Sequence, residues 1–177
     1  MSEVHFRPFQ KADAGTLISW AASRDELLQW SGPNFTFPLD DKQLHEYAAT
    51  AGEHRHLISG VWSETGSVVA HAELNLLPEH ELGQIRRFGV APEMRGRGIG
   101  GTMIRWLVGF GFEELRLNRL ELVVFSFNDP ARRCYRAAGF REEGCAHEAR
   151  RASDGHWDLV YMALLKKWRE EQSATQV

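Results

Sequence analysis

The stretch from Arg86 to Trp106 reads "RRFGVAPEMRGRGIGGTMIRW". Four of the six residues from Gly96 to Gly101 are glycines, and they separate an apolar, strand-like run from an apolar, helical run. A strand, a glycine-rich turn and a helix N-terminus form an anion site, because backbone N–H groups and the positive end of the helix dipole converge there. Glycines let a phosphate approach the backbone closely, and Arg95 and Arg97 add positive charge. The alternative is a tight turn that needs only flexible residues.

The glycines also match G-x-G-x-x-G, the fingerprint of dinucleotide binding, but their surroundings do not fit it. In that motif the buried strand ends directly at the first glycine, whereas here "APEMR" separates Val90 from Gly96. The motif also needs an acidic residue at the end of the next strand, and the candidate Glu121 lies inside "RLELVVF". A P-loop is excluded because no Gly-Lys-Ser/Thr follows. A dinucleotide-binding oxidoreductase therefore remains only a remote alternative.

Composition restricts the class of protein. The chain has 177 residues, 43% hydrophobic and 25% charged, which is typical of one globular domain with a substantial core. Its net charge of -3 indicates no nucleic-acid partner. Cys134 and Cys145 form no C-x-x-C pair, which is typical of a reducing compartment. With no apolar leader and no run long enough to span a membrane, the sequence predicts a cytoplasmic protein without a membrane contact.

Hydrophobic periodicity predicts one unit of strands and helices without repeats or linkers. Alternating or continuous apolar runs predict strands over residues 4–9, 56–62, 67–77, 82–90, 119–127, 144–150 and 157–165. Helical spacing predicts helices over residues 13–22, 40–51, 99–115 and 129–139, with Asp13 capping the first of them. The core covers about residues 4–166, and residues 169–177 form a polar tail. The alternating order in the second half predicts an α/β fold with a mixed sheet and helices packed on it.

A change of parity marks the strand before the glycine loop. Ile85 is apolar at an odd position, whereas Phe88 and Val90 are apolar at even positions. Because side chains alternate along a strand, this change indicates a β-bulge near Arg87, which can turn a backbone N–H toward a ligand. The alternative is a central strand that is buried on both faces and has no bulge.

These motifs resemble the GNAT superfamily of N-acetyltransferases. Its pyrophosphate signature, Gln/Arg-x-x-Gly-x-Gly/Ala, stands here as Arg95-Gly96-Arg97-Gly98-Ile99-Gly100. A second match is "FSFNDPARRCYRAAGF", with an asparagine after a buried strand, a short helix bearing a tyrosine, and a Gly-Phe ending. The detailed resemblance covers residues 82–140. It implies a GNAT-like single domain over residues 1–177, with a mostly antiparallel sheet of about seven strands and helices on both faces.

The resemblance implies that acetyl-CoA is the cosubstrate and that no metal is needed. In the family, acetyl-CoA and an amine meet in a cleft where two neighbouring strands splay apart, and the amine attacks the thioester directly. A backbone N–H near the bulge would stabilise the oxyanion. The residues implied to bind the cofactor are Phe88, Gly89, Val90, Arg95, Gly96, Arg97, Gly98, Ile99, Gly100, Gly101, Asn128 and Tyr135.

Tyr135 matches the family's general acid, which protonates the leaving thiolate. It lies two helical turns after Asn128, so it faces back toward the strand end. The alternative is packing, because Ala131, Tyr135 and Ala138 form a stripe at helical spacing. Asn128 is expected to cap the helix, to bind the cofactor arm, or both.

The candidate base lies on the strand "VVAHAELNLL". His71, Glu73 and Asn75 share one face of it, and we interpret this face as lining a wet cleft. Glu73 is the candidate base, directly or through water, and His71 is the second candidate. The alternative is a solvent-open sheet face or a histidine with a structural role. The remaining histidines show no metal-ligand pattern.

The acceptor is predicted only as an amine, in a small molecule or a peptide. In the family the first two helices and the loop between them hold it, which points to Leu27–Asp40. Trp30, Phe35 and Phe37 would either line an acceptor pocket or cover the core. Antibiotics, amino acids, polyamines and protein N-termini stay open, as does a homodimer. The main alternative function is a non-catalytic acyl-CoA sensor or interaction module on the same fold.

Overall fold

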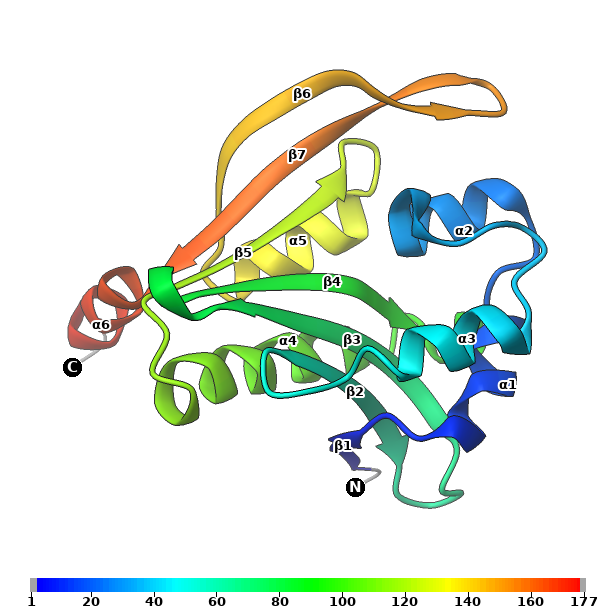
Figure 1. Ribbon diagram of the computed structural model, residues 1–177. Helices are drawn as coiled ribbons and strands as arrows, with labels where there is room; N and C mark the ends of the chain where they lie inside the picture. The colour runs from blue at the N-terminus through cyan, green and yellow to red at the C-terminus, as the bar shows by residue number, and fades with distance from the viewer. Residues whose placement is uncertain (1–2, 176–177) are drawn as a thin grey trace. The chain divides into compact units, whose positions relative to one another are not determined.

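A seven-stranded sheet carries the mixed α/β fold of the computed structural model, which describes residues 3–175 (Figure 1). The strands are hydrogen-bonded in the order β1-β2-β3-β4-β5-β7-β6. The pairs β1–β2, β2–β3, β5–β7 and β6–β7 are antiparallel, whereas β4–β5 is parallel. This confirms the predicted mixed, mostly antiparallel sheet. The strands are β1 (Val4–Pro8), β2 (Arg55–Trp62), β3 (Val68–Leu77), β4 (Leu82–Val90), β5 (Arg119–Phe125), β6 (Arg141–Ala152) and β7 (Gly155–Leu165).

Six α-helices occur among the described residues, together with several short turns of other helix types. Four of the six α-helices overlap segments that the sequence predicts as helical. The α-helices are α1 (Ala14–Ser19), α2 (Arg24–Ser31), α3 (Asp41–Ala48), α4 (Ile99–Gly109), α5 (Asp129–Ala137) and α6 (Lys166–Thr175).

The chain divides into two units, each with its own contacts. The first comprises Met1–Asn75 and Arg86–Met103, and the second comprises Leu76–Ile85 and Ile104–Val177. Strand β4 contributes to both units, because the division falls between Ile85 and Arg86. Helix α4 is also divided, between Met103 and Ile104. Its first turn and the glycine loop before it belong to the first unit.

The first unit places β3 beside β2 and packs α1 to α3 over an apolar core. In the antiparallel register Glu73 lies opposite Leu57, and His71 lies opposite Ser59. Side chains from β2, β3 and the three helices form one cluster, which includes the buried residues Leu17, Leu27 and Leu44. Removing such surfaces from water is the main stabilising contribution of the unit. The same packing covers the polar positions of β3.

Helix α2 is absent from the predicted elements, although its N-terminus carries a recognisable capping pattern. Ser23 accepts a hydrogen bond from the Glu26 backbone N–H at 3.2 Å, and the Glu26 carboxylate accepts one from the Ala22 N–H at 2.8 Å. A serine followed three residues later by a glutamate is the sequence signature of this cap. The weak apolar periodicity of the helix concealed it.

The second unit pairs the first half of β4 with β5 and continues through β7 to β6. Leu82 to Ile85 run parallel to Arg119 to Leu122, and β5 is antiparallel to β7 along its whole length. Strands β6 and β7 form a long hairpin (Figure 1) with register shifts in β6. Asn128 caps α5 by accepting a hydrogen bond from the Ala131 N–H at 3.3 Å, which confirms the predicted cap.

Three local predictions are wrong. Asp13 does not cap α1 with its side chain, because its carboxylate binds Arg7, the Gln10 N–H and the Ser59 hydroxyl. The helix predicted to run to residue 115 becomes a π-helix from Phe110 to Glu114. The tail predicted from residue 169 continues α6 as far as Thr175, and residues 176–177 lie outside the described part of the chain.

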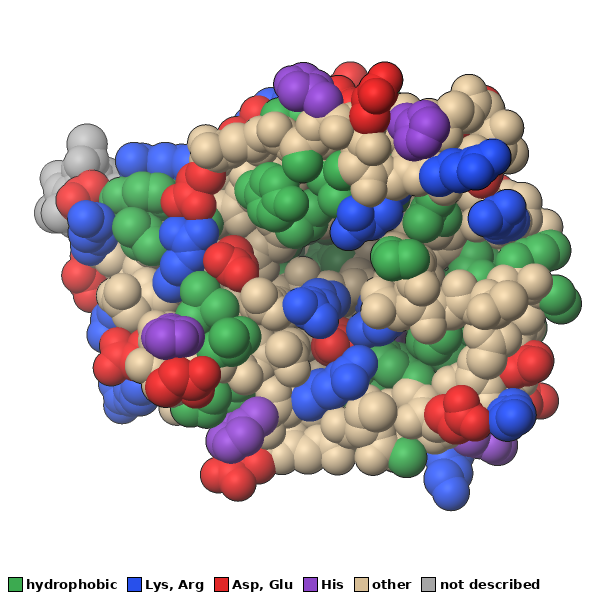
Figure 2. Space-filling model, turned by 45° about the horizontal axis from the view of Figure 1, so that its top comes forward, with side chains coloured by type: hydrophobic (Ala, Val, Ile, Leu, Met, Phe, Trp, Pro, Cys, Tyr) green, Lys and Arg blue, Asp and Glu red, His purple; other side chains and the backbone are tan. Residues whose placement is uncertain are grey.

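The molecular surface carries charges of both signs. Acidic and basic side chains are interspersed over the face that Figure 2 shows. Within residues 3–175, no helix has the length and apolar character that a membrane crossing would need. Cys134 and Cys145 are both free thiols, as their spacing predicts.

Candidate functional site

The glycine loop forms the start of α4 in the first unit. After β4 ends at Val90, one short turn over Pro92–Met94 leads into the loop. Gly96 and Gly98 have φ of +76° and +80°, a left-handed conformation that side-chain-bearing residues adopt only at a cost. A Cβ built on either glycine would have no heavy atom within 4 Å. The loop is therefore left-handed and open at Gly96 and Gly98.

The backbone of this loop presents donors to whatever lies outside it. The first N–H groups of an α-helix have no intrahelical acceptor. Thr102 donates to the Gly98 carbonyl at 3.0 Å, which closes the first turn of α4 behind Ile99, Gly100 and Gly101. These N–H groups lie at the positive end of the helix dipole, which suits a phosphate. Arg95 and Arg97 are exposed on the same loop.

The end of β4 packs under the indole of Trp30. A Cβ built on Gly89 would lie 2.9 Å from Trp30 Cδ1, so only glycine fits at this position. The Trp30 Nε1–H also donates to the Arg87 carbonyl at 2.9 Å. Phe88, Gly89 and Val90 thus lie on the strand segment directly before the glycine loop, held in place by α2.

The backbone leaves the extended conformation at Arg87, whose φ is +46°. This is the position at which the parity change predicts a bulge. A non-glycine residue in the left-handed region is uncommon and carries a free-energy cost of order 1–3 kcal/mol. The observation supports the bulge over the regular two-sided strand.

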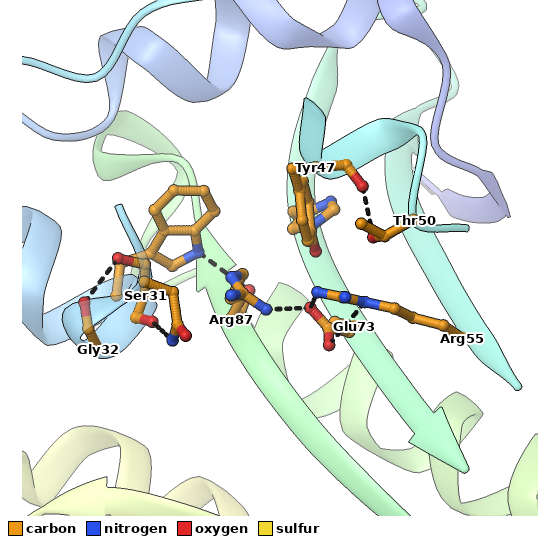
Figure 3. Close-up of polar contacts among 10 residues, drawn as sticks. Ser31, Gly32, Tyr47, Thr50, Arg55, Glu73 and Arg87 are labelled. Carbon is orange, nitrogen blue, oxygen red and sulfur yellow. Dashed lines mark hydrogen bonds and ion pairs between the residues drawn. The ribbon is translucent and has the colours of Figure 1, made fainter. Parts of the chain in front are cut away.

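A buried group of charges lies next to this strand segment (Figure 3). Glu73 is 0% exposed, and its Oε2 accepts hydrogen bonds from Arg87 and, at 3.1 Å, from Arg55 Nη2. Its Oε1 lies 3.1 Å from Arg55 Nε. Both carboxylate oxygens are thus in contact with guanidinium groups. We call Glu73, Arg87, Arg55, Tyr47 and His71 the buried ion cluster.

Aromatic rings enclose the two arginines of this cluster. The Arg87 guanidinium carbon lies 4.8 Å from the centre of the Tyr47 ring and 5.2 Å from that of Phe35. The Arg55 guanidinium carbon lies 5.4 Å from the centre of the same Tyr47 ring. Rings at these distances attract cations through their quadrupoles. Burial, followed by the negative charge of Glu73, raises the pKa of Tyr47 well above its usual value, so its hydroxyl stays protonated.

His71 is fully buried in the same cluster. Its Nε2 lies 3.0 Å from the Tyr47 hydroxyl, and the rings of Phe9 and Trp30 meet it edge-on. Burial, helped by the positive charge of Arg87, lowers the pKa of His71 to about 3. The imidazole is therefore neutral at physiological pH and is a poor acceptor for a substrate proton.

The prediction that these polar positions of β3 line a wet cleft is wrong. His71 and Glu73 are both 0% exposed, and only Asn75 is partly accessible. The alternative, a histidine with a structural role, fits His71. Sequence reasoning missed Arg55 and Tyr47, because the register of β2 against β3 and the packing of α3 bring them to Glu73. Trp30 and Phe35 stack on each other at 5.9 Å and cover the core, whereas Phe37 is 41% exposed.

The other two candidate residues lie in the second unit. The Oδ1 of Asn128 caps α5, and Tyr135 lies on the buried side of that helix. The Tyr135 ring is 6.2 Å from that of Phe140. Burial, followed by the neighbouring Cys134 thiol, raises the pKa of the Tyr135 phenol above its usual range, so it is protonated at neutral pH.

A family model described as "Acetyltransferase (GNAT) family" matches residues 24–140 of this chain. The chain belongs to the GNAT family. The match contains the glycine loop, both arginines that contact Glu73 and the Asn128–Tyr135 helix, which confirms the resemblance inferred from the motifs.

Two curated GNAT relatives align with part of the chain. YdaF of Bacillus subtilis, whose name proposes a ribosomal N-acetyltransferase, is 33% identical over 115 residues. That alignment covers 62% of this chain and 63% of the relative. AaaT of Escherichia coli, named as an L-amino acid N-acetyltransferase, is 29% identical over 57% of this chain and 64% of its own. The chain therefore spans just under two thirds of the length of these curated relatives.

Solved structures agree with the GNAT fold over nearly the whole chain. A spermidine N-acetyltransferase from Vibrio cholerae, crystallised with CoA and spermine, has a TM-score of 0.81 at 21% identity, covering 93% of this chain and 96% of its own. A crystal structure named as a probable acetyltransferase has a TM-score of 0.75 at 26% identity, covering 93% of both chains. At such identities the likeness establishes the fold rather than the acceptor.

Proposed function

We propose that this GNAT chain is a single-domain N-acetyltransferase that moves the acetyl group of acetyl-CoA to a primary amine by direct attack. The observation that carries the proposal is the glycine loop at the start of α4. Its left-handed glycines, its open outer side and its unpaired helical N–H groups are the features that a pyrophosphate needs. Direct attack of an amine on a thioester requires no metal.

In this proposal the pyrophosphate of acetyl-CoA binds the N–H groups from Arg95 to Gly101. Arg95 and Arg97 contribute charge from the flanks of the loop. The pantetheine arm lies along the backbone of Phe88 to Val90 in the manner of an added strand. Asn128 contributes its amide N–H₂, since its Oδ1 already caps α5.

The reaction forms one C–N bond and breaks one C–S bond. The neutral amine nitrogen attacks the thioester carbonyl carbon, and the resulting oxyanion is stabilised by a backbone N–H near Arg87. Collapse of this intermediate expels the CoA thiolate, which takes a proton from the Tyr135 hydroxyl. The phenol is protonated at neutral pH, as a proton donor must be, and the burial that raises its pKa also makes it a weaker acid than a solvent-exposed tyrosine.

The proton lost by the amine goes to Glu73 or to water. Because both Glu73 oxygens contact guanidinium groups, the geometry favours water as the immediate acceptor. In that case Glu73 acts through its ion pair with Arg87. The ion pair stabilises the left-handed backbone at Arg87, which would lie beside the reacting thioester. The low pKa of His71 argues against His71 as the base.

The acceptor class rests on the family and on the names of its members. Relatives and structural neighbours are named for amino-acid, ribosomal and polyamine acceptors, all of which present amines. We therefore propose a small-molecule or peptide primary amine. The free thiols of Cys134 and Cys145 support a cytoplasmic location.

Two measurements on the full chain test the proposal. Acetyl-CoA at about 100 times its dissociation constant should add roughly 2.7 kcal/mol to the free energy of unfolding, detected as a thermal shift. A shift with NAD but not with acetyl-CoA would restore the oxidoreductase alternative. Release of the CoA thiol is then followed with a panel of spermidine, L-amino acids and peptides with free N-termini. Binding without release for any amine would favour the acyl-CoA sensor.

A further inference from the structure

The β6–β7 hairpin contains a wide bulge that no part of the proposed reaction uses. Ala146 pairs with Leu159, and Arg150 pairs with Trp157, so that residues 147–149 of β6 face Asp158 alone. Glu148 adopts a φ of +50° inside this segment. Bulges re-aim side chains that a regular ladder would send elsewhere. Here the bulge directs His147 toward the opposite strand.

Three different metal-binding groups meet at this bulge. The ligand atoms of Cys145, His147 and Asp158 all lie within 4.8 Å of one another. The Cys145 Sγ is 4.0 Å from His147 Nδ1, which in turn is 2.9 Å from Asp158 Oδ2. Cys145 and His147 are exposed, so an ion can reach the group from solvent.

We propose that Cys145, His147 and Asp158 form a binding site for Zn²⁺. Zinc bond lengths of about 2.0–2.3 Å place tetrahedral ligand atoms roughly 3.3–3.6 Å apart. Two of the three separations, 4.0 Å and 2.9 Å, lie on either side of this range, and all three lie within 4.8 Å, so the side chains must rotate to bring their ligand atoms to one ion. A thiolate and an imidazole favour zinc over Mg²⁺ or Ca²⁺, which prefer oxygen ligands.

The arrangement differs from a catalytic proton relay. In a relay the two imidazole nitrogens divide the work, one facing the nucleophile and the other facing the carboxylate. Here the thiol and the carboxylate both approach the same nitrogen, Nδ1 of His147. The group therefore lacks the geometry of a relay, and its three ligand atoms lie within 4.8 Å of one another.

Neighbouring backbone groups hold the carboxylate in place. The Glu148 N–H donates to Asp158 Oδ1 at 2.8 Å, which leaves Oδ2 directed at His147. The Ser126 N–H donates to the Asp158 carbonyl at 3.0 Å and fixes the backbone of that residue. Such outer contacts orient metal ligands in known sites.

Binding has defined chemical consequences. Zinc displaces the thiol proton of Cys145 to solvent, while His147 binds as the neutral imidazole and Asp158 as the carboxylate. A water molecule fills the fourth tetrahedral position. Since only the folded hairpin brings the three side chains together, zinc stabilises β6 and β7 against unfolding.

The test uses Co²⁺ as a spectroscopic probe on the full chain, followed by competition with Zn²⁺. We expect a thiolate-to-cobalt charge-transfer band together with the intense d–d bands of tetrahedral cobalt, both abolished by zinc. Removal of outer contacts alone weakens metal sites by about 10–100-fold, so Cys145→Ser, His147→Gln and Asp158→Asn should each weaken zinc at least about 100-fold. Cys134→Ser and His156→Gln are the matched controls and should bind normally.

Circular dichroism and the thermal midpoint without metal establish that each variant is folded. Cobalt spectra without a charge-transfer band would overturn the proposal, as would zinc affinity that survives Cys145→Ser. Loss of the band in Cys134→Ser but not in Cys145→Ser would assign the thiolate elsewhere and would also overturn it. The site is independent of acetyl transfer, so neither result bears on the proposed function.

Discussion

The glycine loop and the buried ion cluster both pair positive charge with one anion, but they do so in opposite ways. In the cluster the anion belongs to the chain: Glu73 is fully buried, and two arginine side chains contact its oxygens. In the loop the donors are backbone N–H groups, the arginines Arg95 and Arg97 are exposed, and the space beside the glycines is open. One region is complete within the chain, and the other is shaped for an anion that arrives from outside.

This difference separates a contribution to stability from a contribution to binding. A buried carboxylate whose partners are removed leaves a charge without compensation, so the cluster should control folding. A solvent-facing loop does not need its ligand in order to fold. Changes in the loop should therefore alter the affinity for acetyl-CoA rather than the free energy of unfolding. Substitutions in the two regions should therefore affect different measurements.

The largest effect is expected from Glu73→Gln. The change leaves Arg87 buried without its counterion, and breaking a buried pair from one side typically costs about 3–5 kcal/mol. The free energy of unfolding, from urea titration, measures it. Glu121→Gln is the control, because Glu121 pairs with Arg119 at a partly exposed site and should lose less than about 1 kcal/mol. Equal losses in the two variants would contradict the distinction.

Tyr135→Phe should leave both regions intact and affect turnover alone. The variant keeps the ring packed near Phe140 and removes the hydroxyl that we propose as the proton donor to the thiolate. General acids contribute about 100- to 10,000-fold, and a thiolate leaves readily, so we expect about 100-fold lower kcat. Acetyl-CoA affinity should be nearly unchanged. Full turnover, or a large loss of unfolding free energy, would make Tyr135 a packing residue.

The cluster should also make stability depend on pH through His71. Its pKa is about 3 when folded, against 6.5 for an ordinary histidine, so the unfolded chain binds the extra proton between these values. Neutral His71 makes its full contribution to the free energy of unfolding above pH 6.5. This contribution is lost as the pH falls, by about 1.4 kcal/mol per pH unit, or roughly 2 kcal/mol at pH 5. Urea titrations across this range measure the slope. His71→Gln should flatten it and the exposed His45→Gln should not; the reverse pattern would place the titrating group outside the cluster.

The smallest effect is expected in the loop. A β-branched side chain at the left-handed Gly98 is strained by about 1–2 kcal/mol and enters the approach of the phosphate, so Gly98→Val should weaken acetyl-CoA binding about 10-fold. Calorimetric titration measures the affinity. Gly109→Val makes the same change at the other end of α4, also with open space around it, and should bind normally. Equal affinities in the two variants would mean that the loop is not the phosphate site.

The sequence predicts the loop well because its structure depends on neighbours in the chain. A left-handed turn requires glycine at particular positions, and Gly96 and Gly98 occupy them. The change of parity near Arg87 similarly indicates a local break in β4, where φ is +46°. The cap of α5 by Asn128 follows from a residue three positions away.

The cluster is harder to predict because its members come from distant parts of the chain. The alternation of β3 correctly groups His71 with Glu73, but it cannot show which side chains cover that face. Arg55 reaches Glu73 through the register of β2, and Tyr47 reaches His71 through the packing of α3. A polar face on an inner strand is therefore equally compatible with water and with buried counterions.

The contact between Trp30 and Gly89 links two positions that lie far apart in the chain. Any side chain at position 89 would collide with the indole, while loss of the indole would remove the hydrogen bond to the Arg87 carbonyl. Position 89 therefore cannot take a larger residue while Trp30 is present. A lineage that acquires a larger residue at position 89 must first replace Trp30 with a smaller one. That replacement also removes the contact between α2 and the end of β4, the strand that precedes the glycine loop.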